Sequence, residues 1–167
     1  MAPCSETCNE TMAVAAVNVC IGQIAVADSS GLLRSVLGSC VGVALYHPHQ
    51  RVGVLAHVVL PASEGRGGHP GRYANTAIPE ALRLMDEHGA DPGDVTAKIV
   101  GGASMFGNNG PLQIGQANID AVTEALRRAN ISIAAQHTGE SKGRRITLDC
   151  ETGDLTVEVV GELPIKM

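Results

Sequence analysis

The chain has 167 residues, 44% of them hydrophobic and 17% charged, with a formal net charge of −5 at pH 7. A chain of this length forms about one domain and buries about 70% of its unfolded surface, so it needs no disulfide or metal to fold. Its acidic balance and its low aromatic content, with one Phe, two Tyr and no Trp, argue against nucleic acid as a partner. Binding to the phosphate backbone of a nucleic acid needs an excess of basic residues, and binding to single-stranded nucleic acid needs aromatic side chains on which the bases stack.

The beginning of the chain is polar and carries no basic segment typical of a secretion signal. The apolar stretch that begins at Met12 is interrupted by Asn18 and is too short to cross a bilayer. We therefore expect residues 1–12 to be a disordered tail and residues 13–167 to form a single domain. We also expect the protein to be cytoplasmic and not inserted in a membrane.

The five cysteines indicate reduced thiols, because their number is odd and they lack the paired C-x-x-C spacing of zinc sites. Cys4 and Cys8 could supply two ligands to a metal, but nothing nearby supplies the other two. We expect neither a metal nor a cofactor.

Apolar runs between turn residues predict the strands. Residues 13–28 are expected to form a first strand, and residues 42–46 and 53–60 a hairpin with Cys40 near its start. A glycine-rich loop follows over residues 63–71. Further short strands are expected over residues 96–100, 131–135, 145–149 and 155–160.

Apolar residues at helical spacing predict two helices, over residues 74–88 and 116–129. The resulting order is strands, helix, strand, helix and strands. This order predicts a single α+β domain with two main helices packed on a mixed β-sheet, and it is too irregular for a doubly wound fold.

The most informative residues are Cys40, which closes Leu37-Gly38-Ser39-Cys40, and His57 on the next apolar run. Glycines on both sides leave the thiol poorly shielded, and a histidine on the neighbouring element could take its proton, which is typical of a cysteine hydrolase. The alternative is that both residues belong to the core, since cysteine is often buried and a histidine in an apolar stretch is usually structural.

Further motifs follow this pair in order along the chain. They lie at residues 56–61, 73–78, 98–106, 114–118, 138–144 and 151–153. Together with the cysteine motif, over roughly residues 18–160, they resemble the CheD family, the chemoreceptor glutamine deamidases of bacterial and archaeal chemotaxis. A long ordered match of this kind is much more specific than a single motif.

The resemblance implies a cysteine-dependent protein-glutamine deamidase that converts selected glutamines of methyl-accepting chemotaxis receptors to glutamate. By position, Cys40 is the nucleophile and His57 the base. The thiolate would attack the amide carbon, His57 would protonate the departing ammonia, and water would hydrolyse the thioester. We expect an adjacent imidazolium to lower the pKa of the thiol. The resemblance also implies the layered α+β sandwich of certain toxin deamidases.

The oxyanion of the intermediate needs donors, and the backbone around Gly38, Ser39 and Cys40 is the natural source. The Ser39 hydroxyl could add another. An equally good interpretation of the glycines at 38 and 42 is that they only permit a tight turn and close strand packing.

Two departures from the family pattern affect the candidate site. The family usually has a threonine six positions before the cysteine, where this chain has Arg34, and Ser35 is the nearest hydroxyl that could replace it as the third catalytic member. A shift of one residue along a strand reverses the face to which a side chain points, so a hydroxyl at position 35 need not reach the place that a hydroxyl at position 34 would occupy. Many members also have D-T-G-G where this chain has residues 137–140, and His137 is expected to be a loop residue or a substrate contact.

The remaining candidates concern substrate binding. The run at residues 101–106 lacks the Lys-Ser/Thr pair of a phosphate loop, so we interpret it as a wall of the receptor-binding cleft, with Phe106, or as backbone packing. Tyr73, Asn75 and Thr76 begin the first helix, where capping and docking are the expected tasks.

Two other functions remain open on the sequence. The protein could be a non-catalytic regulatory partner of receptors or of the chemotaxis phosphatase CheC, which members of the family bind, and the loss of the threonine favours this alternative. An unrelated hydrolase of small amides is the third possibility. The same thiolate could also hydrolyse receptor methyl esters.

Overall fold

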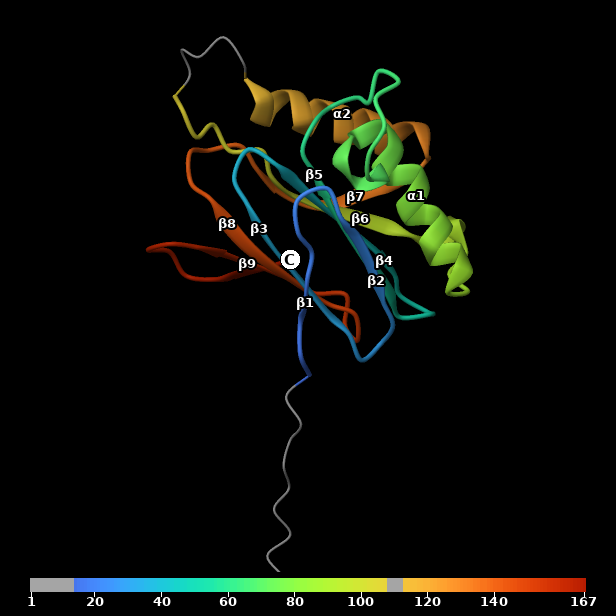
Figure 1. The fold of residues 1–167 in the computed structure, drawn as a ribbon. Helices are drawn as coiled ribbons and strands as arrows, with labels where there is room; N and C mark the ends of the chain where they lie inside the picture. The colour runs from blue at the N-terminus through green and yellow to red at the C-terminus, as the bar shows by residue number, and fades with distance from the viewer. Residues whose placement is uncertain (1–13, 108–112) are drawn as a thin grey trace, which may run out of the picture.

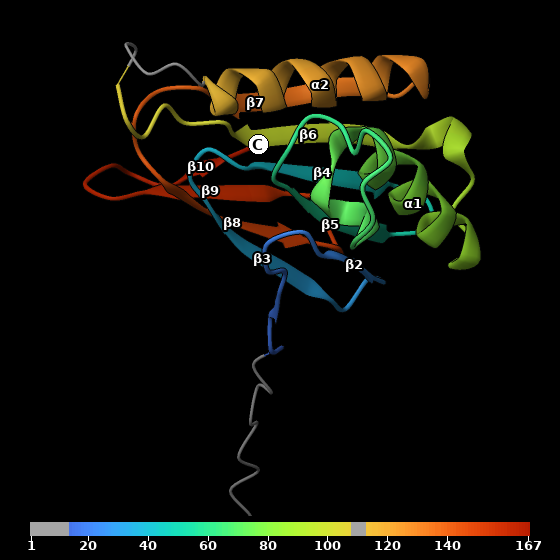
Figure 2. The ribbon, with the colours of Figure 1, turned by 45° about the horizontal axis from the view of Figure 1, so that its top comes forward.

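The computed structural model describes residues 14–107 and 113–167, and these residues form three layers (Figure 1; Figure 2). An outer sheet, a central sheet and a pair of helices are stacked in that order, so the central sheet is covered on both faces. The expected disordered tail, residues 1–12, lies outside the described residues.

Both sheets are mixed. The outer sheet has the strand order β1 (Val17–Asn18), β3 (Leu32–Leu37), β8 (Arg144–Asp149), β9 (Leu155–Val159) and β10 (Ile165–Lys166). The central sheet has the order β2 (Ile24–Ala27), β5 (Val52–Val58), β4 (Val41–His47), β6 (Thr96–Gly101) and β7 (Ser132–Thr138). The pairs β1–β3 and β6–β7 are parallel and the other pairs antiparallel.

The helices α1 (Ala74–Glu87) and α2 (Ile114–Arg128) cover the face of the central sheet that is turned away from the outer sheet (Figure 2). Short 3₁₀ turns, η1 (Pro70–Arg72) and η2 (Pro92–Asp94), lie before and after α1. The core between helices and sheet contains, among others, Val43, Val54, Ile78, Met85, Ile99, Val122 and Leu126.

A second core fills the space between the two sheets. Its buried residues include Leu33, Leu37, Leu55, Val100, Ile146 and Leu148, and Cys40 packs against them half-buried. Every residue of β5 is buried, and so is every residue of β4 except Tyr46. Coverage on both faces explains why these strands have continuous apolar runs in the sequence instead of alternation.

The predicted α+β fold with two main helices is confirmed, and the hairpin and both helices are where the sequence placed them. Three details differ. The strands form two sheets instead of one, β3 and β10 were not expected, and the strand expected over residues 13–28 is divided into β1 and β2 in different sheets. The division follows from a turn at residues 20–23, where Gly22 has φ +74° and its N–H donates to His57 O.

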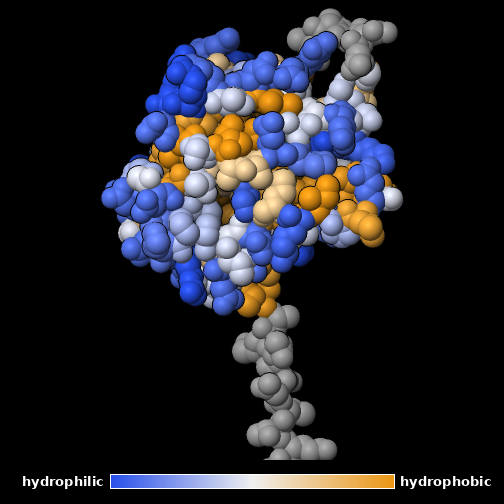
Figure 3. Space-filling view, turned by 180° about the vertical axis from the view of Figure 1, so that it is seen from behind, coloured by the Kyte–Doolittle hydropathy of each residue, from blue (hydrophilic) through white to orange (hydrophobic). Residues whose placement is uncertain are grey.

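Hydrophobic areas interrupt a mainly hydrophilic surface on the face opposite to that of Figure 1 (Figure 3). Exposed apolar residues of the molecule include Val36, Val160 and Leu163. Neither of the two main helices is long and apolar enough to span a membrane, and the same holds for every helix in the described ranges.

Candidate active site

Residues 38–40 form a short loop that carries the chain from β3 in the outer sheet to β4 in the central sheet. All three carbonyl groups of this loop accept hydrogen bonds: Gly38 O from Ala103 N at 2.9 Å, Ser39 O from Asn118 Nδ2 at 3.1 Å, and Cys40 O from Gly102 N at 2.8 Å. The loop is therefore held by the segment that follows β6 and by α2.

Two amide N–H groups of the same loop, those of Ser39 and Cys40, have no partner within residues 14–107 and 113–167. Two free amide donors next to a thiol are what an oxyanion hole requires.

His57 lies on β5 opposite Gly42 of β4, is 3% exposed, and points into the space between the sheets. Its Nδ1 is 2.8 Å from Ser35 Oγ on β3 and 3.3 Å from Val19 O. Because Ser35 Oγ donates its one proton to Val19 O at 2.7 Å, the hydroxyl can only accept from the imidazole. This pattern assigns the proton of a neutral His57 to Nδ1 and leaves Nε2 with a lone pair.

Cys40 and His57 lie on the same side of the central sheet. Gly42 pairs with His57, and Cys40 precedes Gly42 by two residues, so its side chain also turns toward the space between the sheets. A Cβ at Gly42 would lie 2.7 Å from Ile146 Cδ1 and 2.8 Å from Leu37 Cδ1, so glycine at this position lets these two side chains pack directly against β4. The thiol and the imidazole, both within the described residues, form no hydrogen bond; catalytic contacts often tighten only with substrate bound.

The pKa shifts differ from the expected thiolate–imidazolium pair. Burial raises the pKa of the Cys40 thiol. Burial also lowers the pKa of His57, against a smaller opposing effect of the hydrogen bond to the Val19 backbone. Both directions favour a neutral thiol beside a neutral imidazole, so the resting site has a base ready to receive a proton instead of a preformed thiolate.

Ser35, and not Arg34, is the residue beside His57. Residues of β3 alternate, so Ser35 is 4% exposed and faces the central sheet, whereas Arg34 faces away and its Nε donates to Thr147 Oγ1 at 3.3 Å. Of the two residues considered for the third member of the site, the structure therefore places Ser35, and not Arg34, in contact with His57.

A cavity of about 580 Å³ opens next to the loop. It is lined by Ser39, by residues 102–107 and 139–141, and by residues 113–116 at the start of α2. Phe106 lies on its wall and is 96% exposed. Cys40 and His57 do not line this cavity, which ends at Ser39, one residue from the thiol.

The other three predicted substrate contacts are used for packing. Tyr73 is 4% exposed and forms a bridge with Leu60 at the start of α1. The Asn75 side chain bonds to Ser63 N and Ser63 Oγ, and Thr76 Oγ1 donates to Pro70 O. These residues join the glycine-rich loop to α1 and do not lie in the cavity at Ser39.

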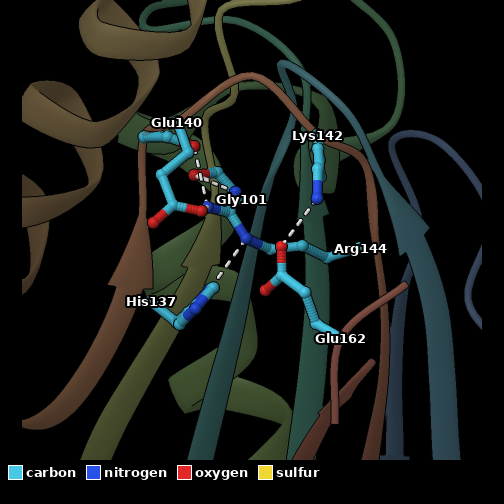
Figure 4. A network of polar contacts seen from close by, with 7 residues as sticks. Gly101, His137, Glu140, Lys142, Arg144 and Glu162 are labelled. Atoms are coloured by element: carbon cyan, nitrogen blue, oxygen red, sulfur yellow. Dashed lines mark hydrogen bonds and ion pairs between the residues drawn. The ribbon is translucent and has the colours of Figure 1, made fainter. Parts of the chain in front are cut away.

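Arg144 is buried and is the centre of a network of polar contacts (Figure 4). Its guanidinium donates to His137 Nδ1 at 2.8 Å, Gly139 O at 2.7 Å, Gly101 O at 3.3 Å and Glu140 Oε2 at 3.4 Å. Burial lowers the pKa of Arg144, while the nearby carboxylates of Glu140 and Glu162 oppose that shift. The network fastens β8 of the outer sheet to the ends of β6 and β7, so His137, on β7, supports the structure as an acceptor.

Sequence reasoning gave no role to Arg144 or Asn118. Asn118 is fully buried and donates to Ser39 O and to Val59 O at 2.8 Å. A signal was present, because Asn118 and Val122 lie four residues apart on the apolar face of α2 and a polar residue on such a face needs a buried partner. No cluster of three or more His, Cys, Asp or Glu able to hold a metal occurs within residues 14–107 and 113–167.

Comparisons with known proteins agree on one family. Residues 59–159 match the family described as CheD chemotactic sensory transduction. A probable chemoreceptor glutamine deamidase CheD of Methanococcus maripaludis is 39% identical over 149 residues, covering 88% of this chain and 97% of the relative. The chemoreceptor glutamine deamidase CheD of Thermotoga maritima is 40% identical over 150 residues, covering 87% of this chain and 95% of the relative.

Among solved structures, the hypothetical protein YfiH of Bacillus licheniformis is similar with a TM-score of 0.46 and 14% identity. The similarity covers 80% of this chain and 61% of that protein. A likeness at this level does not bear on the function.

Proposed function

The chain belongs to the CheD family, and from this premise we propose that it is a cysteine-dependent protein-glutamine deamidase. Its substrates are selected glutamine side chains of methyl-accepting chemotaxis receptors, and its products are glutamate and ammonia. The relatives named above carry the names of chemoreceptor glutamine deamidases over almost their whole length. Because the proposed substrate is the cytoplasmic part of a receptor, the proposed location of the protein is the cytoplasm.

One observation carries the catalytic proposal: the hydrogen bond between His57 Nδ1 and Ser35 Oγ. This contact leaves Nε2 unprotonated, on the side of the sheet where Cys40 lies. A base oriented by a third group, close to a thiol, is the general signature of an activated nucleophile.

The chemistry follows in two halves. In the first, His57 Nε2 takes the thiol proton while Cys40 Sγ attacks the amide carbon of the glutamine, and the oxygen becomes an oxyanion facing the Ser39 and Cys40 N–H groups. His57 then returns the proton to the amide nitrogen, the C–N bond breaks, and ammonia leaves a thioester. In the second half, His57 accepts a proton from water and the resulting hydroxide attacks the thioester carbon. The C–S bond then breaks, His57 returns the proton to Cys40 Sγ, and the side chain leaves as a carboxylic acid that ionises to glutamate.

Each candidate residue has a defined place in this proposal. Cys40 and His57 perform the chemistry, Ser35 orients His57, and the loop of Gly38 and Ser39 forms the oxyanion site. Phe106 contacts the receptor from the wall of the cavity, since an exposed aromatic side chain beside a pocket suits a protein substrate. Tyr73, Asn75 and Thr76 act indirectly, by holding the loop of residues 63–71 on α1.

A non-catalytic regulatory role is the second candidate. The 96% exposure of Phe106 favours it, because a protein that only docks on receptors or on a CheC-type phosphatase also needs an exposed aromatic contact. The two functions are compatible, and catalytic turnover separates them.

The decisive experiment is incubation with a purified cytoplasmic receptor fragment, followed by peptide mass spectrometry to locate amide-to-acid conversion. We expect conversion at specific glutamines that is lost in Cys40→Ala and His57→Ala. Cys20→Ala is the matched control, because Cys20 is an exposed free thiol outside the site. Binding without conversion would overturn the catalytic proposal and leave the regulatory one. The same assay on a methylated fragment tests for ester hydrolysis.

A further inference from the structure

Asn118 on α2 joins the two segments that carry the proposed nucleophile and base. Its Nδ2 donates one proton to Ser39 O at 3.1 Å, next to Cys40, and the other to Val59 O at 2.8 Å, two residues after His57. The side chain is fully buried, so water does not compete for these contacts.

The orientation of the Asn118 amide is fixed by its partners. Its Oδ1 is buried and has no hydrogen-bond partner among the described residues. In the reversed orientation this oxygen would face the two carbonyl oxygens, and acceptors that face acceptors repel one another. The Nδ2 amine therefore faces the two carbonyls. A buried acceptor without a partner is costly, and such a group in a native structure calls for an explanation.

Close backbone packing brings this short side chain within reach of the loop. A Cβ on Gly115 of α2 would lie 2.4 Å from Gly102 O, and a Cβ on Gly102 would lie 2.5 Å from the Ile119 side chain. The start of α2 therefore rests directly on the segment whose Gly102 N–H holds Cys40 O. The helix and the cysteine loop form one rigid unit at this point.

The consequence concerns the Ser39–Cys40 peptide group. In a trans peptide the C=O and the following N–H point in opposite directions. Asn118 lies in the helix layer and holds Ser39 O toward it, so the Cys40 N–H is turned away from the helices. The space between the sheets lies on the far side of the central sheet from the helices (Figure 2). The Cys40 thiol and His57 face the same space, and this N–H makes no hydrogen bond within the described residues.

We propose that Asn118 is a positioning residue that fixes the Ser39–Cys40 peptide plane so that the Cys40 N–H donates to the oxyanion. The proposal deepens the function proposed above and rests on it. Loss of the clamp lets the peptide rotate and the donor turn away, without removing either Cys40 or His57. Reactions that pass through an oxyanion are then slowed, whereas simple alkylation of the thiol is not, because alkylation forms no oxyanion.

The test compares these two reactions at Cys40 in Asn118→Asp and Asn118→Ala. Acylation is followed with p-nitrophenyl acetate and alkylation with iodoacetamide, both located at Cys40 by peptide mapping, well below the unfolding temperature. Val122→Ala is the matched control, since Val122 is also fully buried on α2 but has no side-chain group that could hydrogen-bond to the loop. We expect acylation to fall about 10²–10³-fold, as for the loss of one oxyanion donor. Alkylation should change by no more than a few-fold, and Val122→Ala should leave both rates within a few-fold.

Equal losses in both reactions would reduce Asn118 to a structural clamp, and unchanged acylation would overturn the proposal directly. If neither variant folds, the test is made by NMR on the wild-type protein. A peptide with an aldehyde in place of the glutamine carboxamide forms a thiohemiacetal with Cys40, and this should shift the resonance of the Cys40 amide proton downfield. No shift would overturn the proposal. A wild-type protein that is acylated by the ester but does not deamidate receptors would contradict the proposed function and not the role of Asn118.

Discussion

Ser35 Oγ accepts a hydrogen bond from His57 Nδ1 at 2.8 Å, across the space between the two sheets. Ser35 is on β3 of the outer sheet and His57 on β5 of the central sheet, so the contact depends on how the sheets stack. In the proposed mechanism this hydroxyl orients His57, although Arg34 occupies the position where the resemblance to the family leads one to expect threonine.

Replacing Ser35 with alanine should lower kcat for receptor deamidation about 10- to 100-fold. This loss is smaller than the rate enhancement of about 10²–10⁴-fold that general acid–base catalysis supplies. The reason is that Val19 O, 3.3 Å from Nδ1, still accepts a hydrogen bond from the imidazole and partly keeps its orientation. Ser35→Thr keeps the hydroxyl and should retain most of the activity. Arg34→Ala is the matched control and should have little effect, since its side chain faces away. Full activity in Ser35→Ala would remove Ser35 from the site.

The position of Ser35 could not be derived from the sequence, for a physical reason. A hydroxyl at 34 or 35 points to opposite faces of the strand, and the choice is fixed by pairing of β3 with β8, where Ser35 is opposite Ile146, more than a hundred residues away. The polar pair Arg34-Ser35 is also the reason that the sequence did not predict β3. The pair interrupts an apolar run whose buried members are Leu33 and Leu37.

Local patterns fared better. The two helices and the β4–β5 hairpin were predicted because apolar spacing and turn residues encode them within a few residues. The stacking of two sheets and the hydrogen bonds of Asn118 join segments far apart in the chain, and so does the contact between Arg144 and Gly101. Cys40 and His57 were chosen as candidates because each belongs to a motif, yet their common face follows only from the register that places His57 opposite Gly42.

The pH dependence of turnover should reflect a neutral pair. Burial lowers the pKa of His57, so the acid limb of kcat/KM should have its midpoint below the ordinary histidine value of 6.5. As pH falls through that midpoint, Nε2 becomes protonated and the base is lost.

Burial raises the pKa of Cys40, so alkylation of the thiol by iodoacetamide should still increase with pH above the ordinary thiol pKa, about 8.5. A rate of alkylation that is already maximal near pH 6 would indicate a preformed thiolate and contradict this assignment.

Replacing Arg144 with methionine should destabilise the fold by about 3–5 kcal/mol, because three hydrogen-bond acceptors lose their donor at about 1–3 kcal/mol each. The change leaves His137 Nδ1 and the carbonyls of Gly101 and Gly139 without their donor. For a chain of this size the melting temperature should fall by about 6–20 °C, measurable by calorimetry. Arg145→Met is the matched control, because the neighbouring side chain is exposed, and it should shift the melting temperature by no more than about 2 °C. Equal shifts in both variants would show that the network contributes nothing.

Gly101→Ala should be among the most damaging single-methyl changes in the molecule. Gly101 has φ +109°, and a Cβ there would lie 2.3 Å from Cys40 O, a backbone atom that cannot move without displacing the proposed nucleophile. Strain and overpacking together predict a loss of about 2–6 kcal/mol in the free energy of unfolding, with a fall in kcat even at temperatures where the variant is folded.

Gly89→Ala separates the two causes, because Gly89 also has a positive φ, +79°, but a Cβ there would have no neighbour within 4 Å. That variant should lose about 1–2 kcal/mol and keep its activity. Denaturant unfolding and receptor deamidation measured on both variants check the prediction, and a Gly101→Ala protein as stable and active as Gly89→Ala would show that the approach to Cys40 O is not tight.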